Sequence, residues 1–530
     1  MLALSRSIYK VAGTVARLDK STVIVVGGGI GGLASALALA CAGLEVTVIE
    51  KEPSLGGKIR QIQAGDQAID SGPTVFTMRW VFDELFRQAG TRLEDEMQIS
   101  PLAILARHAW SKDERLDLFA DRLQSAEAIA EFSSRAEANR FLDFCQQASH
   151  LYQALKKPYM LSGRPSMGSM MTSLGASGSK ALFDIGLFSN LWKTLGHYFH
   201  DSRLRQLFGR YATYCGSSPF QAPATLMLIA EVEMQGVWSV TGGMSTLVKT
   251  FQRLAEQKGV RFITGHQCNE ILLKNGRACG VRLDNDDVHH AHSIIFNGDA
   301  RALQVGLLGT GLKNASAIDR QAIPSLSALT WSMLAKPQGF PLLRHTVFFN
   351  ANYQAEFDDI FIRQQLPKHP TVYICAQDQT DVHLDRPHEQ GIFCLVNAPA
   401  QISPRPELTT EEIEACESQA FALLKQCGLE LNPNLNTVTR TSPHAFSQLF
   451  PATGGALYGS ASHGWMGIFK RPAAQSTILG LYLTGGSTHP GAGVPMAALS
   501  GRMAAATLMG HLGLIKPSGK ALISGGTSMP

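Results

Sequence analysis

A glycine-rich turn near the N-terminus is the residue pattern with the clearest chemistry. It carries Gly27, Gly29 and Gly32 in a GxGxxG spacing, with Gly31 as a further glycine. The first glycine permits a tight turn, the second lets backbone approach a pyrophosphate, and the third lets a helix pack closely on a strand. Glu50 follows a later apolar run, and its carboxylate can accept both ribose hydroxyls while repelling a 2′-phosphate. The pattern therefore predicts a dinucleotide site.

A strand, a turn and a helix must position these groups. Residues 22–26 (TVIVV) are rich in β-branched side chains and predict a strand, and the Ala/Leu-rich residues after the turn predict a helix. Residues 46–49 predict a second strand that ends at Glu50. A helix that starts at the turn offers free N–H groups and its positive dipole end to phosphates. This order is the Rossmann fingerprint, and a glycine turn without a ligand is the alternative.

Two long uncharged stretches have the hydropathy of membrane spans. Residues 21–44 contain no charged side chain, but a β-branched run, a glycine turn and a helical stretch divide them. Residues 473–501 are uncharged apart from His489, and their glycine and proline content opposes a continuous helix. The sequence therefore predicts no transmembrane segment.

Composition limits the classes of function. The chain has 530 residues and 57.3 kDa, about three domains by length, and 45 % apolar residues exclude general disorder. Only 17 % of the residues are charged and the mean hydropathy is +0.01, which indicates contact with lipid or an apolar ligand. A net charge of +4 opposes a nucleic-acid partner. Nine scattered cysteines without a CxxC pair predict free thiols in a reducing compartment and no metal site.

Acid–base chemistry has only weak candidates in this sequence. His489 precedes Pro490 and Gly491, in a turn that it could hold rather than serve as a base. Glu231 and Glu233 could face a substrate slot, although solvated surface is the preferred interpretation. Neither HExxH nor GxSxG occurs, so no catalytic residue is assigned.

Several segments resemble flavoproteins of the amine-oxidase, Rab-GDI and carotenoid-desaturase superfamily. A glycine pair and a base follow Glu50, residues 70–74 (DSGPT) resemble a segment beside the flavin ring, and residues 242–247 (GGMSTL) resemble the re-entry into the cofactor domain. A hairpin with an Asn275-Gly276 turn contains the strand that aligns with the adenine contact. Residues 482–496 resemble the closing strand, turn and helix, whose N-terminus faces the flavin. The residues assigned to FAD are Gly27, Gly29, Gly31, Gly32, Glu50, Lys51, Gly57, Lys58, Gly72, Pro73, Thr74, Cys268, Gly485, Gly486, Gly493, Val494 and Met496.

From residue 22 to about 510 the chain resembles the bacterial carotenoid desaturases of the phytoene-desaturase type. Three stretches, 78–86, 204–219 and 493–502, resemble the 1-hydroxycarotenoid 3,4-desaturase branch of that family. The resemblance implies an FAD-dependent enzyme of carotenoid biosynthesis that forms the C3–C4 double bond of acyclic 1-hydroxycarotenoids. A hydride passes to the flavin and a proton is lost to a base.

The resemblance also implies an α/β fold with a Rossmann-type FAD-binding domain of the glutathione-reductase/amine-oxidase-like superfamily. We expect this domain to be discontinuous, with an α+β substrate domain and a helical membrane-facing part between its segments. The expected ranges are an N-terminal extension at 1–20, the FAD-binding domain at 21–95, 240–300 and 475–515, the substrate and membrane-associating domain at 96–239 and 301–474, and a flexible tail at 516–530.

One amphipathic segment bears on membrane contact. Phe188, Leu191, Trp192, Leu195, Tyr198 and Phe199 recur at helical spacing. A helix that packs on the protein's own core is the preferred interpretation, and a helix in the membrane interface is the alternative. The implied location is peripheral, on the cytoplasmic side of the inner membrane.

Partners and rival functions follow from the same features. Because no second GxGxxG is found, oxygen or a quinone is expected to reoxidise the flavin. The expected substrate is an acyclic carotenoid, and no nucleic acid is expected. The alternatives are phytoene or neurosporene desaturation, amine or porphyrinogen oxidation, and a non-enzymatic GDI-like lipid-binding protein.

Overall fold

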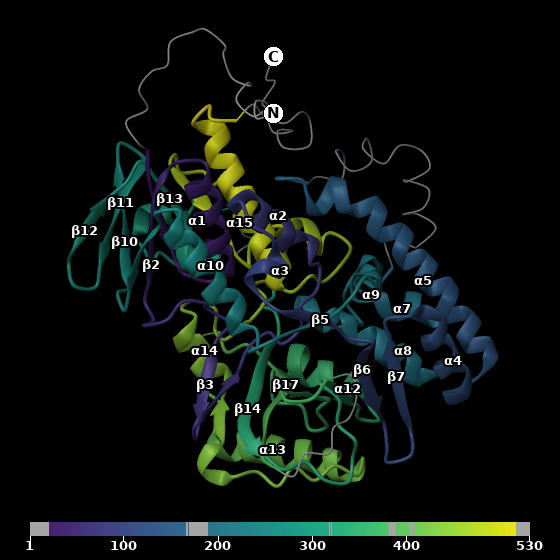
Figure 1. Cartoon of the computed structure of the whole chain (residues 1–530). Coiled ribbons are helices and arrows are strands. Elements are labelled where there is room, and N and C mark those ends of the chain that lie inside the picture. The colour runs from purple at the N-terminus through teal and green to yellow at the C-terminus, as the bar shows by residue number, and fades with distance from the viewer. Residues whose placement is uncertain are drawn as a thin grey trace, which may run out of the picture.

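The computed structural model describes residues 21–165, 168, 189–316, 319, 321–380, 388–402 and 407–515. The expected extension at 1–20 and the expected tail at 516–530 lie outside these residues, as does Phe188. Figure 1 shows segments from the start, middle and end of the chain side by side around one sheet.

That sheet is parallel and has the strand order β19-β13-β1-β2-β9. Alternate residues of β1 point to opposite faces, with Val23 and Val25 in one apolar cluster and Ile24 and Val26 in another. Because both faces are covered, the strands are almost uniformly apolar. The strands are β1 (Thr22–Val26), β2 (Glu45–Glu50), β9 (Arg261–Thr264), β13 (Ser293–Phe296) and β19 (Leu481–Leu483).

Helices cover one face of the parallel sheet and an antiparallel sheet covers the other. Two of these helices, which contain Gly31 and Gly501, approach so closely that a Cβ added at Gly501 would lie 2.2 Å from the Gly31 carbonyl oxygen. The predicted Asn275-Gly276 hairpin joins β10 to β11. The covering elements are α1 (Ile30–Cys41), α2 (Trp80–Ala89), α3 (Leu93–Glu96), α10 (Ser245–Gln257), α15 (Val494–His511), β10 (Cys268–Lys274), β11 (Arg277–Leu283) and β12 (Val288–His290).

A second, seven-stranded sheet has the order β18-β14-β17-β16-β15-β6-β7. Helix α13 (Thr410–Gln426) begins at a Thr409–Glu412 capping box and buries Cys416, Ala420 and Leu424 against one face of this sheet. The strands are β6 (Ile104–Ala109), β7 (Arg115–Phe119), β14 (Ser327–Ala335), β15 (His345–Phe348), β16 (Val372–Ala376), β17 (Gln390–Ala398) and β18 (Thr439–Thr441).

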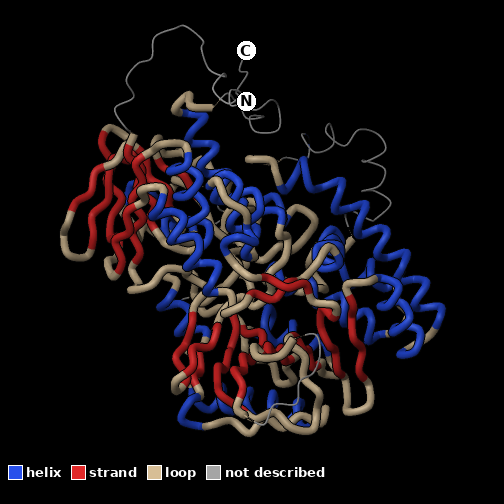
Figure 2. Tube along the Cα trace, viewed as in Figure 1, coloured by secondary structure: helices blue, strands red, loops and turns tan. Residues whose placement is uncertain are grey.

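One small ribbon lies between the two large sheets, and a second lies against the seven-stranded sheet (Figure 2). Strands β5 (Ile99–Pro101) and β8 (Trp238–Val240) pair where the chain leaves and re-enters the region of the parallel sheet. The hairpin of β3 (Gln61–Ala64) and β4 (Gln67–Asp70) packs Ala64 and Ile69 on Leu334 of β14. The expected domain boundaries fall near these crossings and stay a prediction.

A helical region lies beside the seven-stranded sheet (Figure 1). Its helices and short turns are α4 (Arg122–Phe132), α5 (Arg135–Leu155), η1 (Lys156–Met160), α7 (Leu191–Tyr198), α8 (Ser202–Gly209), η2 (Arg210–Cys215), η3 (Ala224–Met227) and α9 (Leu228–Met234). Elsewhere lie α11 (Ala300–Gln304), η4 (Thr310–Leu312), α12 (Tyr353–Asp358), η5 (Asp359–Arg363), η6 (Leu435–Thr437), α14 (Pro443–Leu449) and η7 (Gly467–Lys470).

The amphipathic segment forms α7, and its apolar face is covered by the protein. Leu191, Leu195 and Phe199 are buried, and the Trp192 ring lies 4.6 Å from that of Phe220. The core interpretation is therefore confirmed, and the alternative that this face lies in a membrane is wrong. Among the residues that the structure describes, no helix has the length and apolar content needed to cross a bilayer.

Candidate functional site

A large cavity of about 760 Å³ runs from the carboxyl edge of the parallel sheet to the uncovered face of the seven-stranded sheet. The predicted cofactor residues on its wall are Gly27, Gly29, Gly31, Glu50, Lys51, Gly57, Lys58, Gly72, Pro73, Thr74, Cys268, Gly485, Gly486, Gly493, Val494 and Met496. Gly32 does not line the cavity. A Cβ at Gly32 would lie 2.1 Å from the Gly27 carbonyl oxygen, as expected for its predicted packing role.

The phosphate turn opens on the cavity at the N-terminus of α1. Gly27 has φ +102°, in the region that favours glycine, and so reverses the chain after β1. Helix α1 has no side-chain cap, so the N–H groups of its first turn are available to a ligand. The Asn297 amide donates to the Gly27 carbonyl at 3.0 Å and holds the turn from the end of β13. This geometry fits a diphosphate.

Glu50 ends β2 at the same edge of the sheet. Its carboxylate accepts the Gly28 N–H at 2.7 Å and the Glu52 N–H at 3.0 Å, and it lines the cavity. Each carboxylate oxygen has a second acceptor position, so the group can also accept ribose hydroxyls. Nearby on the wall, burial raises the pKa of the Cys268 thiol to about 12, so Cys268 acts as a small apolar group. This end of the cavity fits an adenosine.

Segments far apart in the chain close the other end of the cofactor site. The Asp70 carboxylate accepts the Met244 N–H, which joins the DSGPT segment to the GGM segment. Lys58 Nζ donates to the Leu457 carbonyl oxygen, and burial lowers the pKa of this ammonium to about 8. Helix α15 begins after Gly493 without a side-chain cap and also opens on the cavity. Two uncapped helix N-termini thus face one cavity, which suits a ligand with negative charge at two places.

The three acid–base candidates have different positions. Glu233 lines the cavity, is 6 % exposed, and accepts Tyr214 Oη at 2.6 Å and Tyr211 Oη at 2.7 Å. Glu231 is 5 % exposed and pairs with Arg122 away from the cavity wall. The prediction that both glutamates are solvated surface is therefore wrong. The partners come from α4, which carries Arg122, and from η2, which carries both tyrosines, and a buried carboxylate requires such partners.

His489 lies behind the cavity wall. Its Nε2 donates to the Tyr159 carbonyl oxygen at 3.0 Å, and the side chain is 3 % exposed. Burial lowers the pKa of His489 to about 4, so the ring is neutral at pH 7. This supports the interpretation that His489 holds its turn.

Acid sensitivity follows from the neutral His489 ring. Because its pKa in the folded state lies below the usual 6.5, its contribution to stability is complete above pH 6.5 and is lost as pH falls toward 4. The free energy of unfolding of the wild type falls between pH 7.5 and 4, and we expect this fall to be about 3 kcal/mol smaller in His489→Gln. Urea unfolding at several pH values between 7.5 and 4 measures it, with exposed His290→Gln as control. An unchanged pH slope in His489→Gln would contradict this role.

Two positioning residues were not predicted from the sequence. Asn297 had a usable signal, because an Asn-Gly pair follows a β-branched run at the carboxyl end of a strand. Arg471 had none: it donates to the Tyr458 carbonyl at 2.9 Å and the Gly486 carbonyl at 2.8 Å, and only the fold joins these loops. Arg471 therefore ties the closing segment to the loop that contacts Lys58.

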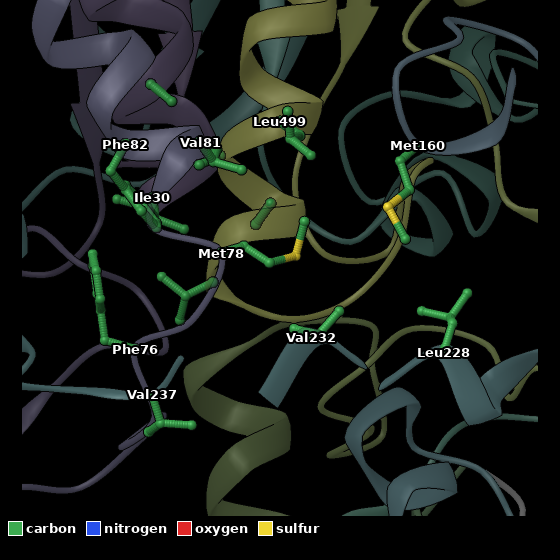
Figure 3. Close-up of a cluster of buried hydrophobic side chains, with 14 of the residues drawn as sticks. Ile30, Phe76, Met78, Val81, Phe82, Met160, Leu228, Val232, Val237 and Leu499 are labelled. Carbon is green, nitrogen blue, oxygen red and sulfur yellow. The ribbon is translucent and has the colours of Figure 1, made fainter. Parts of the chain in front are cut away.

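The remainder of the cavity wall is mainly apolar. Figure 3 shows Met160 projecting down toward Leu228 and Val232, which point up from α9, with Met78 on the left between these two levels. All four line the cavity. The wall near the flavin segments is thus suited to a long apolar substrate.

Comparisons with known proteins agree with this geometry. Residues 30–339 match the family described as flavin containing amine oxidoreductase. The chain is 53 % identical over 507 residues to hydroxyneurosporene desaturase of Rubrivivax gelatinosus, with 96 % of each chain covered. It is 42 % identical to hydroxyneurosporene desaturase of Cereibacter sphaeroides, over 92 % of this chain and 98 % of that one. The chain belongs to the carotenoid desaturases of the flavin-containing amine oxidoreductase family.

A solved structure confirms the fold of this carotenoid desaturase. Cyclohexylamine oxidase from Brevibacterium oxydans IH-35A superposes with a TM-score of 0.55 at 14 % identity, over 93 % of this chain and all 100 % of that one. The carotenoid desaturase is an FAD-dependent oxidoreductase with an α/β, Rossmann-type cofactor fold, as its sequence predicted.

Proposed function

We propose that this carotenoid desaturase forms the C3–C4 double bond of acyclic 1-hydroxycarotenoids in carotenoid biosynthesis. The proposal is supported by the two relatives named hydroxyneurosporene desaturase, which match nearly the whole chain. The observation that carries it is the continuity of the cavity, because one space joins the predicted flavin segments to an apolar wall. A polyene could therefore reach the cofactor without leaving an apolar environment.

We propose these roles for the predicted site residues. The α1 turn and Glu50 hold the diphosphate and the ribose, the backbone at Cys268 contacts the adenine, and the segments at 57–58, 72–74 and 485–496 surround the flavin. When bound, FAD supplies the hydride acceptor. The protein's own contributions are to orient the polyene, to exclude water through residues such as Val232, and to accept a proton at Glu233. The discontinuous domain ranges given above are part of this proposal.

We also propose that the enzyme works as a peripheral protein at the cytoplasmic side of the inner membrane. The support is chemical: an acyclic carotenoid partitions into a bilayer, so the enzyme must meet its substrate there. Oxygen or a quinone is the proposed electron acceptor. Sedimentation with liposomes tests the first part, and reoxidation rates under air or with an added quinone test the second.

Anaerobic mixing of the FAD-loaded protein with 1-hydroxyneurosporene in liposomes tests the reaction. The expected result is bleaching of the flavin absorption together with a red shift of the polyene. Consumption of phytoene or neurosporene in place of 1-hydroxyneurosporene would retain the family and overturn the proposed substrate. Peroxide formed with an amine, and none with carotenoids, would favour amine oxidation instead.

A further inference from the structure

The wall of the cavity becomes polar along one strand of the seven-stranded sheet. Phe393, Leu395 and Asn397 alternate along β17 and all line the cavity. Four residues of a strand span about 13 Å, so the change from aromatic to amide occurs within a short distance. Thr371 precedes β16 and lies beside Asn397, because Val372 pairs with Val396. We call Tyr353, Glu356, Thr371 and Asn397 the polar corner.

Glu356 is the buried anchor of the polar corner. It is 1 % exposed, and its carboxylate accepts Asn397 Nδ2 at 3.0 Å, Thr371 Oγ1 at 2.6 Å and the Thr371 N–H at 3.0 Å. Asn350 Nδ2 adds a fourth hydrogen bond at 3.1 Å. Burial raises the pKa of Glu356 to about 7, although the four hydrogen bonds to its carboxylate act to lower it. The network fixes the amide of Asn397 with its nitrogen toward Glu356.

Two hydrogen-bonding groups of the polar corner have no partner among the described residues. Asn397 Oδ1 accepts no hydrogen bond, and its side chain lines the cavity. The Tyr353 hydroxyl is buried and makes no hydrogen bond, and its residue lines the same cavity. The Tyr353 ring is packed 5.1 Å from Phe357. An acceptor and a donor left unsatisfied in one corner suit a ligand hydroxyl, which donates once and accepts once.

Strand β16 links the polar corner to the predicted flavin segment. Tyr373 is two residues from Thr371 along the chain, and its hydroxyl bonds Thr74 Oγ1 at 2.7 Å. In a 1-hydroxycarotenoid the hydroxyl-bearing carbon is two bonds from C3. A group that binds this hydroxyl must therefore lie on the part of the wall near the reacting carbons. Thr74, Tyr353, Thr371 and Asn397 line the same cavity, and Tyr373 connects Thr74 to the strand that Thr371 precedes.

We propose that Asn397 and Tyr353 bind the substrate's 1-hydroxyl, and that Glu356 positions Asn397. Asn397 Oδ1 accepts the substrate O–H, and the Tyr353 O–H donates to the substrate oxygen. A carotenoid without the hydroxyl leaves both groups unpaired and is disfavoured. This inference rests on the proposed function and names the residues that select its substrate.

Substrate preference tests the inference. For each variant, kcat/KM is measured with 1-hydroxyneurosporene and with neurosporene, and the ratio is compared with that of the wild type. We expect Asn397→Leu and Tyr353→Phe each to lower the ratio at least about tenfold. Thr225→Val is the matched control, because Thr225 also lines the cavity and has a buried hydroxyl without a partner. Its ratio should stay within about twofold of the wild type.

Glu356 requires a separate readout, because a buried carboxylate also stabilises the fold. We expect the single substitution Glu356→Gln to lower this kcat/KM ratio. In a double-mutant cycle, adding Glu356→Gln to Asn397→Leu should lower the ratio no further. Equal ratios in the wild type and Asn397→Leu, or loss of preference in Thr225→Val instead, would overturn the inference while leaving the proposed function intact. A wild type that consumes neither carotenoid would overturn both.

Discussion

Gly29→Val is expected to abolish FAD binding, with at least about a hundredfold rise in Kd, while most of the fold remains. A Cβ at Gly29 would lie 3.1 Å from Asn297 Nδ2 and 3.9 Å from the Gly56 carbonyl oxygen, and all three residues line the cavity, so valine narrows the space for a diphosphate. The Asn297 amide holds the Gly27 carbonyl, so valine also disturbs the turn. Flavin fluorescence titration of the apoprotein measures the affinity.

The control for this variant is Gly510→Val near the end of α15. Its Cβ meets nothing within 4 Å, so the substitution adds the same side chain without touching the cavity. Far-UV circular dichroism of both variants verifies that they fold. Wild-type FAD affinity in folded Gly29→Val would show that the diphosphate does not bind at α1.

Glu233→Gln is expected to lower the single-turnover rate of polyene desaturation by about a hundredfold or more. Glutamine keeps the size of the side chain but has no carboxylate to take the proton. The variant retains an amide oxygen that accepts one of the two tyrosine hydroxyls, so the surrounding packing is preserved. Stopped-flow absorption of the flavin and the polyene measures the rate.

Glu231→Gln is the matched control, two residues earlier on the same helix. It breaks the ion pair between the buried Glu231 and the partly exposed Arg122, away from the cavity, and should lower stability more than the single-turnover rate. A rate in Glu233→Gln within threefold of the wild type would assign Glu233 a structural role. Equal losses of rate in both variants would point to a disturbed α9 rather than a lost base.

The cofactor half of the fold was predictable because its signals are local. Strand Thr22–Val26, the turn at Gly27 and the hairpin turn at Asn275-Gly276 each occupy a few consecutive residues. Side-chain types there determine the backbone directly. β-Branched residues favour an extended strand, and glycine, which lacks a Cβ, permits a positive φ in a turn. The position of Glu50 was predictable for the same reason, because the second predicted strand ends there, as β2 does.

The substrate half was not predictable in the same way. Asn397, Tyr353 and Glu356 come together because β17, β16 and α12 meet, and no spacing in the sequence records that meeting. Glu233 looked like solvated surface because α9 is short and gives too few turns to reveal which face is buried. Burial of such residues depends on long-range packing, which local patterns do not contain.

The order in which the parallel sheet is completed affects biosynthesis of the holoenzyme. Strand β1 and helix α1 come first among the described elements, whereas the edge strand β19 and α15, the helix that packs on α1, come much later in the chain. A nascent chain that has not yet delivered residues 481–511 to this sheet leaves the apolar face of α1 uncovered and lacks one of the two helix ends at the flavin site. Flavin capture therefore requires that α15 has docked, and until then the uncovered face of α1 is open to non-native contacts.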